Sequence, residues 1–397
     1  MKIQGIRVFN GLLIVVTLLT TAYYADTILV NQKISKSSRQ ENRYSTLVFK
    51  GSESILSSSW TKSVLFNSLG TKIYTFNLEE MSIYEFDSAT RKISRKFRFK
   101  PTPSPGWNYQ LNKAIPSFEE KPVEARFSND DQILWVSLHN AGGIVAIPMD
   151  ALNVKTAPKV NYPAKTIFIE NVAEQSTDTI IAPFIKTGKT PKVIARTLNN
   201  KYLLVSNWHS GTISVIRTND SLPPYGKKVR DIRTGTFPRG IAITNSDHKA
   251  YVANMGSDQI SVLNTKSWKV EKKIPTNDNP RHIIADGRQR LYVSYNAPSE
   301  IACINTVNGK TLFKASTSAK PRTIALSKNN KFLFVACYEG NSVDVFRVNK
   351  NSFTKIYSIH CEGKPAGIDI REDAEKLEAW VCTYTGNSLQ VLSFKKK

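Results

Sequence analysis

The sequence predicts an all-β fold, a β-propeller of seven four-stranded antiparallel blades around a central axis. Two observations predict it. Short runs rich in β-branched and aromatic residues alternate with turn-forming residues along most of the chain, as in strands joined by hairpins. One hairpin pattern, YVANMGSDQISVLNT at residues 251–265, also recurs along the chain. Such repeats are typical of propeller blades, which bury their faces against one another.

Each copy of the hairpin follows a short apolar strand that usually starts with proline. The last four of these units start roughly 41–44 residues apart, within the range for propeller blades. The seven units start near residues 61, 122, 191, 238, 280, 321 and 365, and the first has Thr61–Lys62 in place of Lys–Pro. The other hairpin copies lie at Lys72–Phe86, Leu134–Ile147, Tyr202–Ile216, Leu291–Ile304, Phe332–Phe346 and Glu378–Leu392.

The last unit ends at SLQVLSFKKK and lacks a fourth strand. We expect residues 44–50 (YSTLVFK) to complete this blade, because pairing the two ends of the chain removes two open sheet edges. The propeller would then span residues 44–397. Two insertions lengthen the connections between units, at residues 100–121 and 162–189. Loops this long in a compact repeat are usually functional or disordered.

The signature YVAN at Tyr251–Asn254, with LVSN at Leu204–Asn207, resembles the YVTN-repeat propellers, which include YncE-like periplasmic proteins. The resemblance covers about residues 44–395 and is strongest over 189–395. It implies a seven-bladed β-propeller in an exported protein. Function does not follow from the fold in such scaffolds.

The N-terminal residues 1–30 read as a signal peptide or a signal anchor. Lys2 and Arg7 precede an apolar stretch, Gly11–Ala22, and no small-residue cleavage site follows it. This favours an uncleaved anchor that holds the protein on the membrane, with a cleaved peptide as the alternative. Residues 31–43 read as a polar tether. We therefore expect an exported protein, periplasmic or on the cell surface.

The chain carries a formal net charge of +23. This favours an acidic polymer or protein partner in the cell envelope, and charge alone would allow nucleic-acid binding, although no base-reading motif is present. The alternative is that the cations guard sheet edges. Residues 91–100 (RKISRKFRFK), expected as an outer strand, fit both interpretations.

The four cysteines lie late in the chain, at Cys303, Cys337, Cys361 and Cys382. Cys337 and Cys382 occupy matching positions in neighbouring units, and whether they pair is left open, because blades usually stand beyond the reach of a disulfide. The sequence has no CxxC, zinc or haem-attachment spacing. We expect no cofactor and no metal site.

The residue after each repeat proline enters the innermost strand, and most of these residues are basic. If the units align, Lys192, Arg239, Arg281 and Arg322 form an arc at one mouth of the central channel, with His282 beside it. Such an arc suits an anion. The alternative is pairing with the carboxylates Glu124, Asp286, Glu339 and Asp369. Nearby loops add aromatic side chains, so the expected ligand-binding residues are Lys192, Arg239, Arg281, His282, Arg322, Trp208, His209, Tyr338, Tyr384 and Trp107.

No catalytic residue is expected, because the chain contains neither HExxH nor GxSxG and no telling pair of carboxylates. The sequence therefore favours a non-catalytic protein whose basic channel mouth binds an acidic ligand or partner. One alternative is a lactonase-like metal-dependent hydrolase, as in some propellers. Another is a scaffold subunit of a cell-envelope complex.

Overall fold

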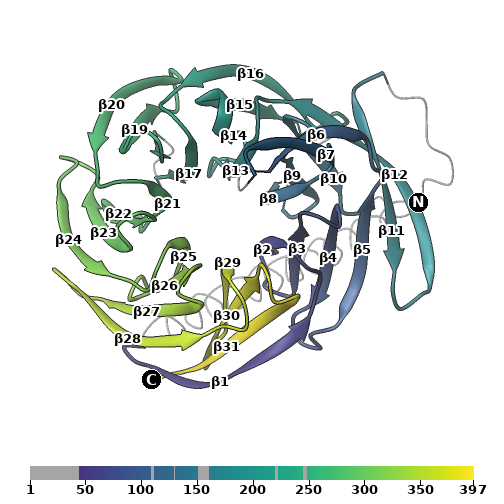
Figure 1. Ribbon diagram of the computed structural model, residues 1–397. Coiled ribbons are helices and arrows are strands. Elements are labelled where there is room, and N and C mark those ends of the chain that lie inside the picture. The colour runs from purple at the N-terminus through teal and green to yellow at the C-terminus, as the bar shows by residue number, and fades with distance from the viewer. Residues whose placement is uncertain (1–43, 109–110, 129, 151–160, 220–221, 245–247) are drawn as a thin grey trace, which may run out of the picture.

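The computed structural model describes residues 44–397 except 109–110, 129, 151–160, 220–221 and 245–247. The expected signal segment and tether lie outside these residues. The prediction of an all-β fold is confirmed: the described residues form strands, with a single 3-10 turn, η1 (Trp208–Ser210). None of the described helical segments is long and apolar enough to span a membrane. Figure 1 shows the sheets following one another around a common axis.

Four consecutive sheets have four antiparallel strands each, in chain order from the centre outward (Figure 1). The first is β13 (Pro191–Arg196), β14 (Tyr202–Asn207), β15 (Thr212–Thr218) and β16 (Gly226–Arg233). The second is β17 (Pro238–Ile243), β18 (Lys249–Asn254), β19 (Gln259–Asn264) and β20 (Lys269–Pro275). The third is β21 (Pro280–Ala285), β22 (Arg290–Tyr295), β23 (Glu300–Asn305) and β24 (Thr311–Ser316). The fourth is β25 (Pro321–Leu326), β26 (Phe332–Cys337), β27 (Ser342–Val348) and β28 (Phe353–His360).

A nine-stranded sheet runs in the order β2-β3-β4-β5-β11-β12-β10-β9-β8. Its strands are β2 (Thr61–Phe66), β3 (Lys72–Asn77), β4 (Ser82–Asp87), β5 (Ile93–Phe99), β8 (Pro122–Ser128), β9 (Ile133–Leu138), β10 (Gly143–Pro148), β11 (Ala164–Asn171) and β12 (Ser176–Lys186). The insertion at 162–189 is therefore not a plain connection, because β11 pairs with both β5 and β12. Consequently β5, in residues 91–100, is not an outer edge.

The other insertion, at 100–121, forms a separate hairpin of β6 (Pro103–Asn108) and β7 (Lys113–Phe118). Its base is attached by Lys165, whose Nζ lies 2.7 Å from Glu120 Oε1, a fully buried carboxylate. Asn140 Nδ2 also donates to the carbonyl of Phe118 at 2.8 Å. These contacts hold the hairpin beside the start of the innermost strands.

The first and last described strands lie in one sheet, ordered β1-β31-β30-β29. β1 (Leu47–Leu56) pairs antiparallel with β31 (Ser388–Lys396), next to β30 (Lys376–Thr383) and β29 (Pro365–Glu372). Tyr44 precedes β1, and its ring stacks on Phe332 of the neighbouring sheet at 5.6 Å. The segment that contains residues 44–50 thus supplies the outermost strand of the last sheet.

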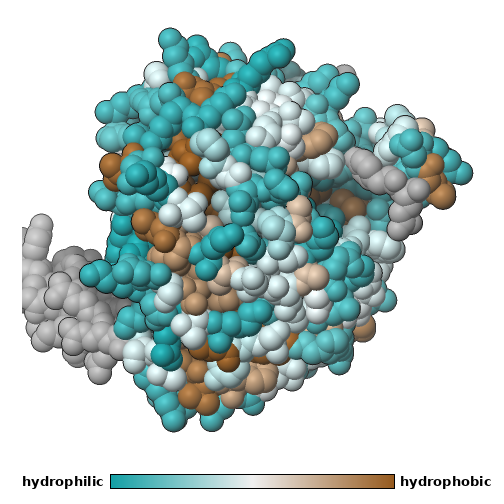
Figure 2. All heavy atoms as spheres, turned by 60° about the vertical axis from the view of Figure 1, so that its left-hand side comes forward, coloured by the Kyte–Doolittle hydropathy of each residue, from teal (hydrophilic) through white to brown (hydrophobic). Residues whose placement is uncertain are grey.

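Burial follows position within each sheet. Second strands such as β9 (ILWVSL) are buried at every residue, because neighbouring sheets cover both faces. Outer strands such as β20 alternate, with Ile274 buried and Lys273 exposed. Figure 2 shows the flank that carries β20 and β24, where hydrophilic side chains cover much of the surface. The hydrophobic clusters fill the spaces between adjacent sheets, which keeps the innermost strands in fixed positions.

The YVAN signature has a structural cause. Asn254, the last residue of β18, is buried, and its Nδ2 donates to Ser261 Oγ at 3.0 Å. Asn207 makes the equivalent bond to Ser214 Oγ at 2.9 Å. A buried amide that joins the second and third strands fixes the loop between them, and these loops border the central channel.

Candidate functional site: a basic cavity at the channel mouth

Five basic residues occupy the second position of an innermost strand. They are Lys62 on β2, Lys192 on β13, Arg239 on β17, Arg281 on β21 and Arg322 on β25, here called the channel cations. All five line one cavity of about 1330 Å³. Lys62 was not among the predicted site residues, because its unit lacks the proline that marks the others. Its place after Thr61, at the start of the first unit, was the signal that could have found it.

The backbone of most channel cations is fixed by a hydroxyl from the preceding sheet. Ser137 Oγ donates to the carbonyl of Lys192 at 2.7 Å, and Ser294 Oγ donates to that of Arg322 at 2.7 Å. Ser206 does the same for Arg239 at 2.8 Å. These bonds join adjacent sheets at the level of the cations, so the cluster is positioned by the rigid part of the fold and not by loops.

The residue before each of these strands also has an unusual backbone. Thr190, Phe237, Asn279 and Lys320 have φ between 56° and 63°, the left-handed region that non-glycine residues seldom adopt. The same conformation occurs at Trp60, before the first unit. This turn directs the chain sharply into the innermost strand. It thereby fixes the backbone position of the channel cation two residues later.

Negative charge at the cluster is scarce. Of the five channel cations, only Arg239 has a carboxylate within ion-pair distance among the described residues, Glu124 Oε1 at 3.4 Å from Nη2. The other carboxylates that the sequence offered as partners are engaged elsewhere: Asp369 accepts from Phe66 N, Glu339 pairs with Lys364, and Asp286 accepts from Arg288 N. The cluster therefore carries a large excess of positive charge.

The electrostatics reflect burial and crowding. Burial, reinforced by Arg239, Lys62 and Arg281, holds the pKa of the Lys192 amine well below its usual range. Burial and the same kind of crowding hold the pKa of Lys62 well below its usual range. Burial raises the pKa of Glu124, against the pull of Arg239 and Lys192. A bound anion would relieve this repulsion.

Aromatic rings support three of the channel cations. Lys62 Nζ lies 4.4 Å from the centre of the Tyr384 ring, and Lys192 Nζ lies 5.5 Å from that of Trp208. The guanidinium carbon of Arg322 lies 3.2 Å from the centre of the Tyr338 ring. Such cation–π contacts stabilise a charge without neutralising it.

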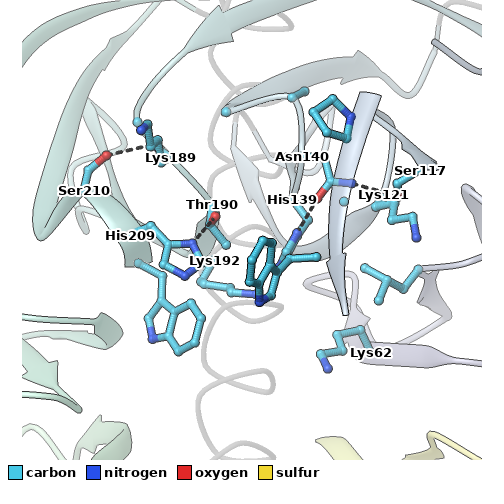
Figure 3. Close-up of a pocket in the computed structure, with 18 of the residues that line it drawn as sticks. Lys62, Ser117, Lys121, His139, Asn140, Lys189, Thr190, Lys192, His209 and Ser210 are labelled. Carbon is cyan, nitrogen blue, oxygen red and sulfur yellow. Dashed lines mark hydrogen bonds between the residues drawn. The ribbon is translucent and has the colours of Figure 1, made fainter. Parts of the chain in front are cut away.

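The rim of the cavity comes from the hairpin and from two loops (Figure 3). Figure 3 shows one group at Lys189, Thr190, His209 and Ser210, and another at Ser117, Lys121, His139 and Asn140, with Lys192 between them. Hydrogen bonds hold each group, among them Thr190 Oγ1 to His209 Nδ1 at 2.7 Å and Asn140 Nδ2 to Ser117 Oγ at 3.1 Å. Trp107 of β6 lies at the rim and is 50% exposed.

Most of the predicted site residues come together in this cavity. Its lining includes Lys192, Arg239, Arg281, Arg322, Trp208, His209, Tyr384 and Trp107. His282 and Tyr338 are not part of the lining: Tyr338 lies against Arg322, and His282 Nδ1 accepts from Ile324 N of the next sheet at 3.4 Å. Burial, together with Arg239 and Arg281, lowers the pKa of His282 to about 3. Lining residues outside the predicted set include Lys62, Glu79, Lys121, Lys186 and Lys189.

Other reactive groups lie apart from the cavity or are inaccessible. Cys337 and Cys382 are both buried and unbridged, and burial raises the pKa of the Cys382 thiol to about 12. Within the described ranges, no three His, Cys, Asp or Glu side chains gather in a way that could hold a metal ion.

Comparisons with known proteins agree with this architecture. The family model described as "Choice-of-anchor I domain" matches residues 123–380. Kuenenia stuttgartiensis hydrazine synthase is similar in structure, with a TM-score of 0.62 and 14% identity over 87% of this chain and 98% of that one. The WD40 β-propeller domain of Doa1 has a TM-score of 0.58 and 11% identity over 88% and 95%. At such identities the likeness shows the β-propeller fold alone. No curated protein matches the chain.

Proposed function

Because the chain belongs to the choice-of-anchor I family and folds as a β-propeller, we propose that it is a non-catalytic binding protein. Its ligand is acidic, either a molecule or the acidic surface of a protein partner, and is held in the channel-mouth cavity. One observation carries this proposal. Five cations converge on one volume, and in the described part of the chain a single carboxylate is paired to them.

A cluster of like charges destabilises the fold unless an anion compensates it. Repulsion among buried cations costs stability, and nothing in the fold requires five of them at this level. Val123 and Ala366 occupy the matching positions on β8 and β29, so an apolar residue fits there. In a recessed site with low-dielectric walls, the same charges raise the local concentration and the affinity of an anion.

We also propose that the propeller has seven blades and that the protein is related to the YVTN-repeat propellers. The nine-stranded sheet holds two four-stranded groups, β2 to β5 and β8, β9, β10 with β12, which β11 joins. Together with the five four-stranded sheets they give seven blades around the axis. The buried asparagine of YVAN and its bond to the third strand support the kinship.

We further propose that the protein is exported and membrane-anchored through residues 1–30, with the cavity facing away from the membrane. Tyr44, where the described chain begins, accepts hydrogen bonds at its carbonyl from Asn329 and Lys331, in the turn before β26. The cavity-side loop follows the other end of β26, at Tyr338. A six-residue strand spans roughly 20 Å, so Tyr44 lies toward the face opposite the cavity.

The binding proposal is tested with the protein and a panel of anionic ligands at low and high salt. The Arg239/Arg281/Arg322→Ala variant should lose binding, and wild-type affinity should fall steeply with salt. The matched control removes the same charge from the outer strands, as Lys227/Arg233/Lys273→Ala, three exposed residues on β16 and β20. Equal loss in both variants would mean that the charge acts as a general surface property and would overturn the proposal.

A further inference from the structure

We propose that the ligand is a compact polyanion, a small molecule with several carboxylate or phosphate groups, and not a polymer held by stacking of its rings. This inference rests on the proposed function and names the ligand class for the same cavity. Three features of the cavity carry it: unpaired donors, occupied aromatic rings and convergent charge.

The first feature is the number of donors that lack a partner. Arg322 Nε is buried and, within the described part of the chain, has no hydrogen-bond acceptor. Among the described residues, Arg281 has only one weak hydrogen-bond acceptor, Met255 Sδ at 3.9 Å from Nη1. Buried donors are normally satisfied, and a guanidinium presents a planar fork that matches carboxylate or phosphate. A ligand with several oxyanion groups would satisfy both arginines at once.

The second feature is that the aromatic rings are already in use. Trp208 has Lys192 at 5.5 Å, His209 at 4.6 Å and Phe237 at 4.7 Å from its ring. A base or sugar needs an open ring face for stacking. Trp208 therefore holds a channel cation in place instead of offering a platform to the ligand.

The same holds for the two tyrosines that the sequence suggested as stacking residues. The Tyr384 ring has Lys62 at 4.4 Å and Trp60 at 4.8 Å from its centre. The Tyr338 ring has Arg322 at 3.2 Å and Lys364 at 5.0 Å. Among the predicted site aromatics in the described chain, Trp107 is the one with no ring or cation against it. One exposed ring at the rim is too little to hold successive bases or sugars.

The third feature is the arrangement of the charges. Each channel cation is the second residue of an innermost strand, and these strands surround the central axis. The cations therefore converge on one volume. A groove for a single strand of polymer would instead place cations along a path, at the spacing of the backbone. A cavity of about 1330 Å³ is of the order that small ligands occupy.

The test is isothermal titration of the full chain with citrate and with tripolyphosphate, which separate carboxylate from phosphate chemistry. An oligothymidylate serves as the polymer. We expect one small polyanion to bind in a one-to-one complex, and Arg281→Gln and Arg322→Gln to weaken it by roughly tenfold or more each. Trp107→Ala should change the affinity by less than about threefold, because stacking contributes little.

Controls keep the outcome interpretable. Arg281→Lys retains the charge and loses the fork, so its affinity should lie between wild type and Arg281→Gln. Lys273→Gln, on the outer flank, should bind as wild type does. Tight binding of the oligothymidylate with neither small polyanion, or loss of binding in Trp107→Ala, would overturn the inference and leave the acidic-ligand function standing. Absence of binding by every anion would overturn both.

Discussion

Ser206 Oγ donates a hydrogen bond of 2.8 Å to the backbone carbonyl of Arg239, across the boundary between two sheets. Ser137 and Ser294 make the same bond to Lys192 and Arg322. A hydroxyl on one sheet thus fixes the backbone of a channel cation on the next. The cavity and the packing of the sheets are therefore parts of one arrangement, and a change to either should affect the other.

Ser206→Ala should lower the free energy of unfolding by about 1 kcal/mol, because it leaves a buried carbonyl without its donor. Urea unfolding followed by circular dichroism would measure this. Ser316→Ala, at an exposed position on β24, is the control and should be neutral. An unchanged urea midpoint for Ser206→Ala would mean that the carbonyl finds another donor and that the bond does not position Arg239.

Closure of the ring gives a second prediction about stability. Leu47 of β1 is 2% exposed and belongs to a buried cluster with Phe332 and Phe394, whereas Leu56, at the other end of the strand, is 82% exposed. Leu47→Ala should cost about 2–4 kcal/mol and lower the midpoint of a single cooperative transition. Leu56→Ala should be nearly neutral. Equal effects would show that β1 does not stabilise the last sheet.

The crowded Lys192 gives a pH prediction whose sign is fixed by linkage. Its amine faces Arg239, Lys62, Arg281 and Glu124 on other innermost strands. Burial, together with the charge of Lys192, lowers the pKa of His139 and His209 on the adjacent loops. Because the pKa of Lys192 is lower in the folded state, the unfolded state binds more protons in the interval up to the ordinary pKa. Stability therefore rises with pH through that interval.

Lys192→Met removes this penalty while keeping a side chain of similar length. We expect the variant to be more stable than wild type at neutral pH, with a shallower rise of the melting temperature toward alkaline pH. Thermal unfolding across the pH range, at constant ionic strength, measures both. A variant that is less stable at neutral pH would indicate that favourable contacts of Lys192 outweigh its repulsion by the other channel cations.

Binding should also be coupled to protons. Burial and neighbouring cations lower the pKa of both Lys192 and Lys62. A bound anion stabilises the charged forms of these two lysines, so the protein should take up protons when the anion binds. Above pH 8 citrate is fully ionised and contributes none. Titration with citrate in HEPES and in Tris at the same pH would reveal the uptake as a difference in heat. Equal binding heats in the two buffers would exclude this coupling.

The orientation proposal predicts which face lies near a membrane. The native cysteines are buried, so a fluorophore on Lys350→Cys reports the face of the strand turns near Tyr44, and one on Lys189→Cys reports the cavity rim. In vesicles that contain the full chain and a headgroup quencher, the label at 350 should be quenched more strongly. Stronger quenching at 189 would place the cavity toward the membrane.

Local sequence patterns were informative where the units are regular. The proline before each inner strand located Lys192, Arg239, Arg281 and Arg322, because one residue type marks the same position in successive sheets. Lys62 was missed where that mark is absent. The ring contacts of Trp208 and Tyr384 could not be inferred either, since they join residues from different sheets and depend on how the sheets pack.

The second region that the sequence did not reveal is the junction between the first two four-stranded groups. Residues 162–189 suggested a lengthened connection, but they form β11 and β12, and β11 pairs with β5. This pairing is long-range in sequence, and the alternation that predicts a strand does not specify its partner. Residues 100–121 likewise suggested only a lengthened connection, but they contain the hairpin of β6 and β7.

The most direct test of the binding proposal is a crystal structure of the protein grown with tripolyphosphate or citrate. The proposal predicts an ordered anion within the cavity, with oxygens within hydrogen-bond distance of the Arg281 and Arg322 guanidinium groups. Arg322 Nε, which now lacks an acceptor in the described structure, should gain one. An anion bound only to the lysines of the outer strands, with the cavity free of it, would contradict the proposal.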